Sequence, residues 1–158
     1  MSAAEQNLRL AIGSDGAGLG YKQVIAEDLR LDSRVRSVLD LGPPEGEPKA
    51  NTYTSVAVRA GELIVAGEID RAILVCGTGI GVAIAANKVP GIRATVAHDS
   101  FSVERSILSN DCQILTFGER VIGLQLARRL AQEWLGYRFD PSSHSYANVC
   151  EIVDYENR

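Results

Sequence analysis

The feature that most constrains this chain is a pattern that occurs twice: a short apolar run, a glycine-rich turn and a segment with helical spacing. The first instance joins the apolar run at residues 8–12 to the turn Gly13-Ser-Asp-Gly-Ala-Gly18. The second joins the run at residues 72–76 to Gly77-Thr-Gly-Ile-Gly81. Short, unbroken apolar runs bounded by such turns are typical of buried strands in a parallel sheet. The pattern therefore predicts an α/β fold.

The rest of the chain continues this alternation of strand and helix. Further strands are predicted at residues 35–41, 92–97 and 113–117, and helices over about 21–29, 53–65, 82–87, 100–108 and 121–135. Right-handed crossovers between parallel strands place helices on both faces of the sheet. We expect a single three-layer α/β/α domain over residues 1–158, with a five-stranded, parallel, Rossmann-like sheet and a C-terminal appendage from about residue 140. The sequence leaves the order of the strands open.

The charged residues are scattered along the chain. Its 158 residues include 16 Lys and Arg and 20 Asp and Glu, which gives a net charge of −4. Because a nucleic-acid platform needs a clustered basic face, no nucleic-acid partner is expected. The apolar run at residues 72–76 is far shorter than the ~20 residues of a membrane span, so no membrane partner is expected either. Residues 1–7 are polar and do not resemble a secretory signal, which favours a cytoplasmic protein.

The cysteines and histidines give no indication of a metal site. The three cysteines, Cys76, Cys112 and Cys150, show no CxxC spacing, and the chain contains two histidines. Neither a disulfide framework nor a zinc cage is suggested by this usage. We therefore expect no metal, and we assign Cys112 and Cys150 to packing.

The second glycine-rich turn predicts an anion pocket. Its three glycines alternate with other residues, which lets successive backbone N–H groups turn toward one point. Cys76 ends the preceding strand beside this pocket, where exposed amides favour a thiolate that acts as a base or a nucleophile. The alternative is that Cys76 is a small core residue at the end of a strand.

Two further interpretations of the glycine-rich turns stay open. Nucleotide binding is one, although the turn at residues 77–81 has neither the P-loop pattern nor the full GxGxxG fingerprint. In the first turn, Asp15 is a candidate acceptor for a substrate hydroxyl. Its alternative role is that of a turn or N-cap residue.

Several motifs, taken together and in order, resemble one family. They are Cys76-Gly-Thr-Gly-Ile-Gly81, Ile84-Ala-Ala-Asn-Lys88, Gly91-Ile-Arg-Ala94, Ser109-Asn110 and Gly118-Glu-Arg-Val-Ile-Gly123. The chain resembles the ribose-5-phosphate isomerase B and galactose-6-phosphate isomerase family over nearly its whole length. The resemblance implies aldose–ketose isomerisation of a sugar phosphate through an enediolate, without metal or cofactor. It also implies a homodimer or higher homo-oligomer, with sites shared between two subunits.

The resemblance implies a role for several residues. Cys76 would be the catalytic base, and Thr78 with the amides of Gly77, Gly79 and Gly81 would form the anion hole. A base together with donors for an oxyanion suits a reaction that moves a proton between adjacent carbons while negative charge develops on oxygen.

Four other positions match places where family members contact the substrate. Asp15, Tyr53 and Asn110 would contact the sugar, and Arg120 would hold the phosphate. The alternatives are a core aromatic for Tyr53, a helix C-terminal cap for Asn110 and a solvated charge for Arg120.

Departures from the family pattern narrow the expected substrate. Ribose-phosphate members typically carry Asp-His and His-Asn where this chain has Asp15-Gly16 and Ser109-Asn110, and the second histidine is the one assigned to opening the furanose ring. A tetrose phosphorylated on its terminal oxygen has no hydroxyl placed to form a furanose. We therefore hypothesise a four-carbon substrate.

Further motifs resemble the branch of the family that acts on D-erythrulose 4-phosphate. They are Asn87-Lys-Val-Pro-Gly-Ile-Arg93, His98-Asp99, Glu104-Arg105 and Leu108-Ser-Asn110. For His98 we expect a structural role, or one behind the residues that touch the substrate. The family alternative is isomerisation of ribose 5-phosphate or a hexose 6-phosphate, and an alternative of another class is a noncatalytic sensor of a phosphorylated metabolite.

The phosphate end of the site departs from the family as well. Ribose-phosphate members usually carry two arginines where this chain has His144 and Asn148. Losing bidentate guanidinium donors weakens phosphate binding unless Arg120, His144 and backbone amides suffice. The alternative for His144 is an exposed loop histidine.

Overall fold

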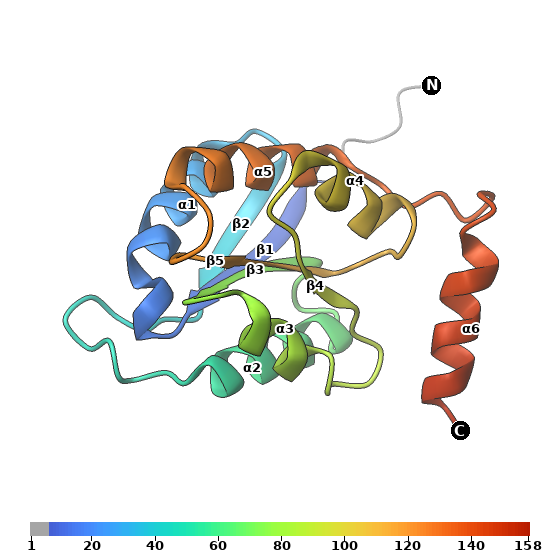
Figure 1. Cartoon of the computed structure of the whole chain (residues 1–158), viewed down its shortest axis with the longest axis horizontal. Coiled ribbons are helices and arrows are strands. Elements are labelled where there is room, and N and C mark those ends of the chain that lie inside the picture. The colour runs from blue at the N-terminus through green and yellow to red at the C-terminus, as the bar shows by residue number, and fades with distance from the viewer. Residues whose placement is uncertain (1–6) are drawn as a thin grey trace.

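The computed structural model describes residues 7–158 and has a parallel sheet at its centre (Figure 1). Its five strands are β1 (Leu8–Ser14), β2 (Val35–Asp40), β3 (Arg71–Cys76), β4 (Ala94–Val96) and β5 (Ile114–Gly118). They lie in the order β2-β1-β3-β5-β4, and all neighbours are parallel. The predicted α/β fold with a five-stranded parallel sheet is confirmed.

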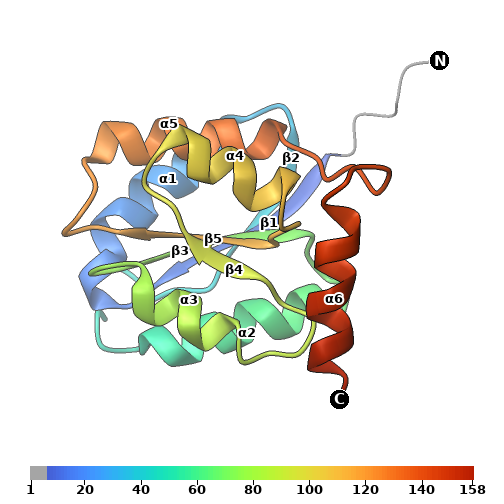
Figure 2. The ribbon, with the colours of Figure 1, turned by 45° about the vertical axis from the view of Figure 1, so that its right-hand side comes forward.

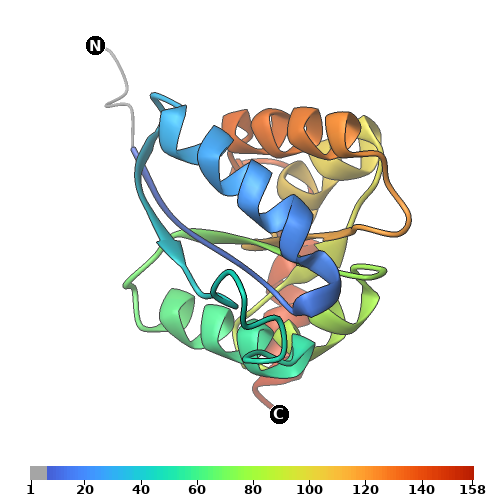
Figure 3. The ribbon, with the colours of Figure 1, turned by 90° about the vertical axis from the view of Figure 1, so that its left-hand side faces the viewer.

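Helices cover both faces of the sheet, as Figures 2 and 3 show. On one face lie α1 (Leu19–Leu31), α4 (Ser100–Leu108) and α5 (Leu124–Gly136), and on the other lie α2 (Tyr53–Val65) and α3 (Ile80–Ala86). A short 3-10 turn, Gly16–Gly18, leads into α1. Within residues 7–158, no helix combines the length and the hydrophobicity that a membrane span requires.

Two elements begin two or more residues later than the sequence-based prediction. The strand expected over residues 92–97 is limited to β4, because the Ile92 N–H bonds back to the Val89 carbonyl and the Asn87 side chain binds both backbone groups of Ala94. The helix expected from residue 121 begins at Leu124. The Val121 and Ile122 amides instead donate to the Gly118 carbonyl in a turn.

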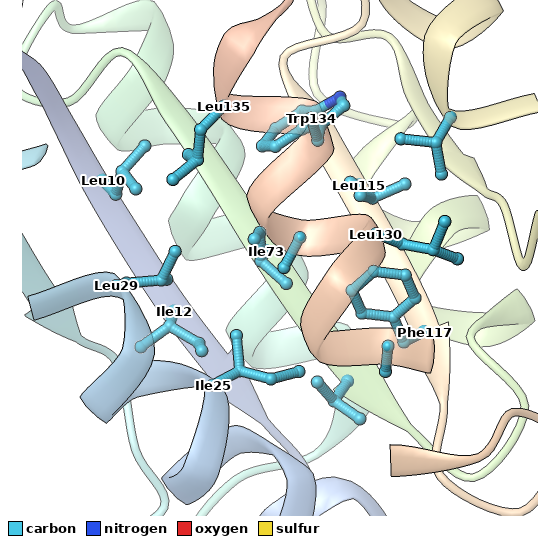
Figure 4. Close-up of a cluster of buried hydrophobic side chains, with 14 of the residues drawn as sticks. Leu10, Ile12, Ile25, Leu29, Ile73, Leu115, Phe117, Leu130, Trp134 and Leu135 are labelled. Atoms are coloured by element: carbon cyan, nitrogen blue, oxygen red, sulfur yellow. The ribbon is translucent and has the colours of Figure 1, made fainter. Parts of the chain in front are cut away.

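The strands divide their side chains between two cores. Figure 4 shows the larger one, where Ile73 of β3 lies with Leu10, Leu130 and Trp134 under α1, α4 and α5. The alternate side chains of β3, Leu74 and Cys76 among them, point to the face that α2 and α3 cover. They belong to the second core. Alternation along the strand thus decides which face the Cys76 thiol occupies.

The direction in which the chain winds reverses between β1 and β3. From β1 the chain crosses one face through α1 to reach β2, and it returns over the other face through α2 to reach β3. In parallel sheets, ligands bind beyond the carboxyl ends of the strands where the direction of winding reverses in this way. Both glycine-rich turns follow these two strands, so both lie at this point.

The C-terminal segment expected from about residue 140 contains helix α6 (Tyr146–Glu156). The helix stands outside the two helical layers, near the amino ends of the strands (Figure 2). It contributes one buried side chain, Val149, and its Glu156 carboxylate accepts a hydrogen bond from the Gly91 amide at 2.7 Å. Tyr146, Ile152 and Tyr155 are 50%, 48% and 73% exposed, so α6 presents apolar surface that its own chain does not cover.

Candidate functional site

Cys76 is the last residue of β3, and its thiol is buried against the glycine-rich turn that follows. The Gly79 amide donates a hydrogen bond to the Cys76 Sγ atom at 3.1 Å. Gly79 has a φ of +77°, and a Cβ at this position would lie 2.9 Å from both Val96 and the Phe117 backbone. Only glycine fits this turn, which aims an N–H at the sulfur. This bond holds the Gly79 amide against the Cys76 sulfur.

The Thr78 side chain lies on the outer side of the same turn and is exposed. Its Oγ1 atom accepts a hydrogen bond from the Ile80 amide at 3.3 Å. Because the hydroxyl oxygen accepts this bond, the hydroxyl hydrogen is left to donate to another oxygen. Thr78 therefore offers a donor within two residues of the Cys76 thiol.

The turn after β5 packs closely on this loop. The Glu119 and Arg120 amides donate to the carbonyls of Cys76 and Gly77 at 2.9 and 3.0 Å. A Cβ on Gly118 would lie 2.5 Å from the Thr78 carbonyl carbon, so a side chain at residue 118 would displace the loop. These contacts fix the loop against the end of β5.

Two long side chains lie against the glycines of the loop. The Arg120 guanidinium passes within 3.4 Å of the position that a Cβ on Gly77 would occupy. The Tyr53 ring, at the start of α2, lies 2.9 Å from the corresponding position on Gly81. Tyr53 is 48% exposed and so is not part of the core. The missing Cβ of Gly81 thus makes room for the Tyr53 ring, and the Arg120 side chain lies beside Gly77 at ordinary contact distance.

Asp15 lies beside this cluster, in the turn after β1. Its Oδ1 atom accepts hydrogen bonds from the Ala17 and Gly18 amides at 2.9 and 3.2 Å, which is the turn role that the sequence left open. Gly18 packs on the Val75 carbonyl, where a Cβ would lie 2.4 Å away. This contact holds the Asp15 turn next to the end of β3, and the second carboxylate oxygen takes no part in the turn bonds.

Three predicted site residues lie elsewhere. Asn110 follows α4 and precedes β5, and its side chain donates to the Arg105 carbonyl at 3.3 Å. His144 and Asn148 are exposed at the beginning of α6, which follows α5. In a parallel sheet, helices run back from the carboxyl ends of the strands to the amino ends, so all three lie at the opposite edge from Cys76. One chain therefore does not bring them to the glycine loop.

Two residues support the loop from behind. The His98 Nε2 atom accepts a hydrogen bond from the Gly118 amide at 3.0 Å, and its ring stacks on Phe117. These contacts place His98 against the backbone of the turn, as a structural role requires. The Glu119 carboxylate accepts from the Tyr21 amide at 3.0 Å and so caps the first turn of α1. No local pattern indicates this cap, because the two residues are 98 positions apart.

The long connection between β2 and α2 lies beside the Asp15 turn. The buried Lys22 ammonium binds both carboxylate oxygens of Asp40 at 2.9 Å and the Pro43 carbonyl at 3.2 Å. The Asn51 amide donates to the carbonyls of Leu41 and Ser14 at 2.9 and 3.3 Å. Both ends of this long connection are therefore fixed beside the Asp15 turn. Neither Lys22 nor Asn51 stands out in the sequence.

The groups gathered here are suited to binding an anion and moving a proton. They are a thiol, a hydroxyl, a guanidinium, a phenol, a carboxylate and backbone amides. Within the part of the chain that the structure describes, no three His, Cys, Asp or Glu side chains lie together in a way that could hold a metal ion. A thiol can act as an acid or a base, and fixed donors around it can stabilise a developing negative charge.

Comparisons with known proteins give a consistent result. Residues 10–152 match the family model described as Ribose/Galactose Isomerase. The chain is 56% identical to D-erythrulose-4-phosphate isomerase 2 of Mycolicibacterium smegmatis, over 94% of this chain and 97% of that protein. It is 38% identical to D-erythrulose-4-phosphate isomerase of Pectobacterium atrosepticum, over 96% of this chain and 97% of the relative. The solved structure of Clostridium thermocellum ribose-5-phosphate isomerase B has a TM-score of 0.87 and 39% identity, over 95% of this chain and 98% of that one.

The contact between Gly118 and Thr78 can be tested by adding one methyl group. In Gly118→Ala, the new Cβ would overlap the Thr78 backbone, so we expect a loss of about 1–3 kcal/mol in the free energy of unfolding. Displacement of the loop should also lower kcat/KM by roughly 100-fold. Gly123→Ala is the matched control, because nothing lies within 4 Å of its added Cβ. Equal kcat/KM values for the two variants would contradict this role of Gly118.

The hydrogen bond to His98 predicts a pH dependence of stability. Burial lowers the pKa of His98, and the nearby Asp99 carboxylate offsets this effect in part. Because the unfolded chain takes up this proton more readily than the folded chain, the free energy of unfolding should fall as the pH drops below about 6.5. His98→Gln should lack this component in urea unfolding measured between about pH 7.5 and 5.5. The control is His144→Gln, an exposed position, and a parallel loss of stability in wild type and His98→Gln would refute the prediction.

Proposed function

Because this chain belongs to the ribose/galactose isomerase family, we propose that it interconverts D-erythrulose 4-phosphate and D-erythrose 4-phosphate without a cofactor. The observation that carries the proposal is the Cys76 thiol at the carboxyl end of β3, with the Gly79 amide on its sulfur and the Thr78 hydroxyl in the same glycine-rich turn. The two D-erythrulose-4-phosphate isomerases of the comparison support the choice of substrate.

The proposed mechanism moves one proton between two neighbouring carbons. The Cys76 thiolate removes a proton from C1 of the ketose, and the electron pair of that C–H bond forms an enediolate whose charge rests on the C2 oxygen. The thiol then returns a proton to C2 while the hydroxyl proton on O1 is transferred to O2, which leaves an aldehyde at C1. Atoms and charge balance without an external oxidant or reductant.

The donors around Cys76 suit the intermediate of this reaction. The Thr78 hydroxyl and the amides of Gly77 and Gly81 would stabilise the enediolate oxygen. Donors that are fixed in place before reaction stabilise developing charge without reorganisation. The Gly79 amide stays hydrogen-bonded to the sulfur and is therefore not counted among these donors. Asp15 and Tyr53 would contact the sugar hydroxyls, and Arg120 would bind the phosphate.

The residue after α4 supports a four-carbon substrate. Ser109, where ribose-phosphate members typically carry a histidine, lies near the Arg105 guanidinium. A serine hydroxyl is a poor acid and base near neutral pH, so this position does not supply a group for ring opening. Ribose 5-phosphate, which closes to a furanose, is the second candidate substrate, because the similar structure from Clostridium thermocellum is a ribose-5-phosphate isomerase B.

We further propose that the active unit is a homodimer with shared sites. Asn110, His144 and Asn148 lie at the opposite edge of the sheet from Cys76, so a second copy is needed to bring them to the loop. The uncovered apolar side chains of α6 support such an interface. So does a groove of about 740 Å³ that Ile152 and Tyr155 of α6 form with β4 and α4. In the partner's site, His144 and Asn148 would assist Arg120 with the phosphate.

The substrate and the base can be tested in one experiment. Proton NMR in deuterated buffer should show conversion of D-erythrulose 4-phosphate with deuterium uptake, and at least ~10-fold slower conversion of ribose 5-phosphate. Cys76→Ala should lower kcat by roughly 10²- to 10⁴-fold with little change in KM, since a general base acts on the transition state. Cys112→Ala is the control, because burial raises the pKa of that thiol to about 12.

Each arm of this experiment has a result that would overturn its claim. Conversion of ribose 5-phosphate alone would keep the isomerase and reject the four-carbon substrate. Full activity of Cys76→Ala would reject Cys76 as the base. Binding of both sugar phosphates without conversion or deuterium uptake would reject the isomerase activity and favour a noncatalytic sensor.

The shared site predicts complementation between two inactive variants. If Cys76 and Asn110 of one site come from different chains, a 1:1 mixture of Cys76→Ala and Asn110→Ala subunits should regain about a quarter of wild-type activity, because half of the dimers contain one intact site. Cys76→Ala mixed with Arg120→Ala is the control. Those residues share one chain's cluster, so no mixed dimer has an intact site. Equal activity of the two mixtures would contradict the shared site.

A further inference from the structure

A second cavity lies at the edge of the sheet opposite to Cys76. It has a volume of about 720 Å³ and is lined by residues from the amino ends of β1, β2 and β3 and from the segment after α5: Asn7, Leu8, Arg9, Arg36, Asp70, Arg71 and Arg138. Four of these residues are arginines, whereas Asp70 is the single carboxylate of the lining. The lining therefore carries three more positive than negative charges.

The one carboxylate is already paired with one of the arginines. The Asp70 oxygens accept hydrogen bonds from the Arg9 guanidinium at 2.7 and 3.2 Å, and the Arg9 amide donates to Asp70 at 2.7 Å. The Nη1 atom of the Arg9 guanidinium donates to the Gly67 carbonyl. Asp70 therefore forms its salt bridge with Arg9, and the other three arginines of the cavity form no salt bridge with this carboxylate.

Arg71 is the most unusual of the three, because it is 9% exposed and forms no salt bridge with a carboxylate of residues 7–158. Its guanidinium donates to the carbonyls of Trp134 and Tyr137 at 3.1 and 2.9 Å and lies over the Trp134 ring. Burial and the charge of Arg138 lower the pKa of Arg71 to about 10, and the more distant Asp111 and Asp70 carboxylates offset this effect only in part. Buried charges in proteins are normally paired with an opposite charge.

Arg36 and Arg138 are the other two arginines of the cavity that form no salt bridge within residues 7–158. Both are exposed, and neither forms an ion pair within the described residues. One guanidinium nitrogen of Arg138 donates to the carbonyls of Leu135 and Tyr137, and its other nitrogens form no hydrogen bond within the described residues. Free guanidinium donors from β2 and from the segment after α5 thus flank the buried charge of Arg71.

We infer that this arginine cavity is a binding site for a phosphate group, separate from the substrate site. Guanidinium groups bind phosphate oxygens through paired, charge-assisted hydrogen bonds, and Arg36 and Arg138 would supply them at the mouth of the cavity. The volume lies within the range of small-molecule sites, so inorganic phosphate and a phosphorylated metabolite both fit. Such a ligand would neutralise charge that the chain itself leaves unpaired. The inference does not depend on the proposed isomerase activity.

The test is a phosphate titration of the full chain, followed by ¹⁵N–¹H NMR at constant ionic strength. Inorganic phosphate should shift the amides of Leu8, Arg36, Arg71 and Arg138 with saturation below ~10 mM, separately from any shifts in the loop at residues 77–81. The double variant Arg36→Ala/Arg138→Ala should weaken the response at Leu8 and Arg71 by at least ~10-fold and leave the loop response unchanged. Arg129→Ala, an exposed arginine on α5, is the control for loss of charge.

A second arm distinguishes the two sources of the phosphate group. D-erythrose 4-phosphate that binds the cavity more tightly than inorganic phosphate would assign the site to a phosphorylated metabolite, and equal or weaker binding would assign it to free phosphate. The absence of saturable shifts around the cavity would overturn the inference. So would a response that Arg129→Ala weakens as much as the double variant does. Isomerase activity of the double variant should equal that of wild type, which separates this site from the Cys76 site.

Discussion

The contact between the turn after β5 and the loop after β3 is the constraint on which the site depends. Gly118 lies directly on the Thr78 backbone, and the next two amides bind the carbonyls of Cys76 and Gly77. This contact sets the course of the loop, and the course of the loop sends the Gly79 amide to the Cys76 sulfur. A loop without this support would have to pay an entropy cost for each ordered residue at the moment of binding.

The same turn links the site to the helices on the far face of the sheet. His98 accepts from the Gly118 amide, and Glu119 caps α1 through the Tyr21 amide. The Tyr21 hydroxyl in turn donates to the Ile122 carbonyl at 2.8 Å. Two neighbours in the motif Gly118-Glu-Arg-Val-Ile-Gly123 thus make different contacts: Glu119 caps a helix, whereas Arg120 reaches the glycine loop.

The two edges of the sheet have different chemistry. At the carboxyl ends of the strands, backbone amides, a thiol and a hydroxyl gather within one loop. At the amino ends lie four arginines and one carboxylate, and two of the arginines, Arg71 and Arg138, donate to the carbonyls at the end of α5. Parallel packing explains the contrast, because helix N-termini meet the first edge and helix C-termini meet the second. The predicted site residues fall at both edges, which is why the proposed site requires two copies of the chain.

The sequence by itself determined the fold class and the centre of the site. Apolar runs and glycine-rich turns specify their own local conformation, so the strands and the position of Cys76 beside a glycine-rich loop follow from neighbouring residues. The sequence did not determine the strand order, the start of α5, or the partners of His98, Glu119 and Lys22. These depend on contacts between segments far apart in the chain: the Glu119–Tyr21 bond spans 98 positions. The tertiary structure alone decided that Asn110 lies at the edge away from Cys76 and that four arginines share a cavity, because only packing of the strands brings such residues together or keeps them apart.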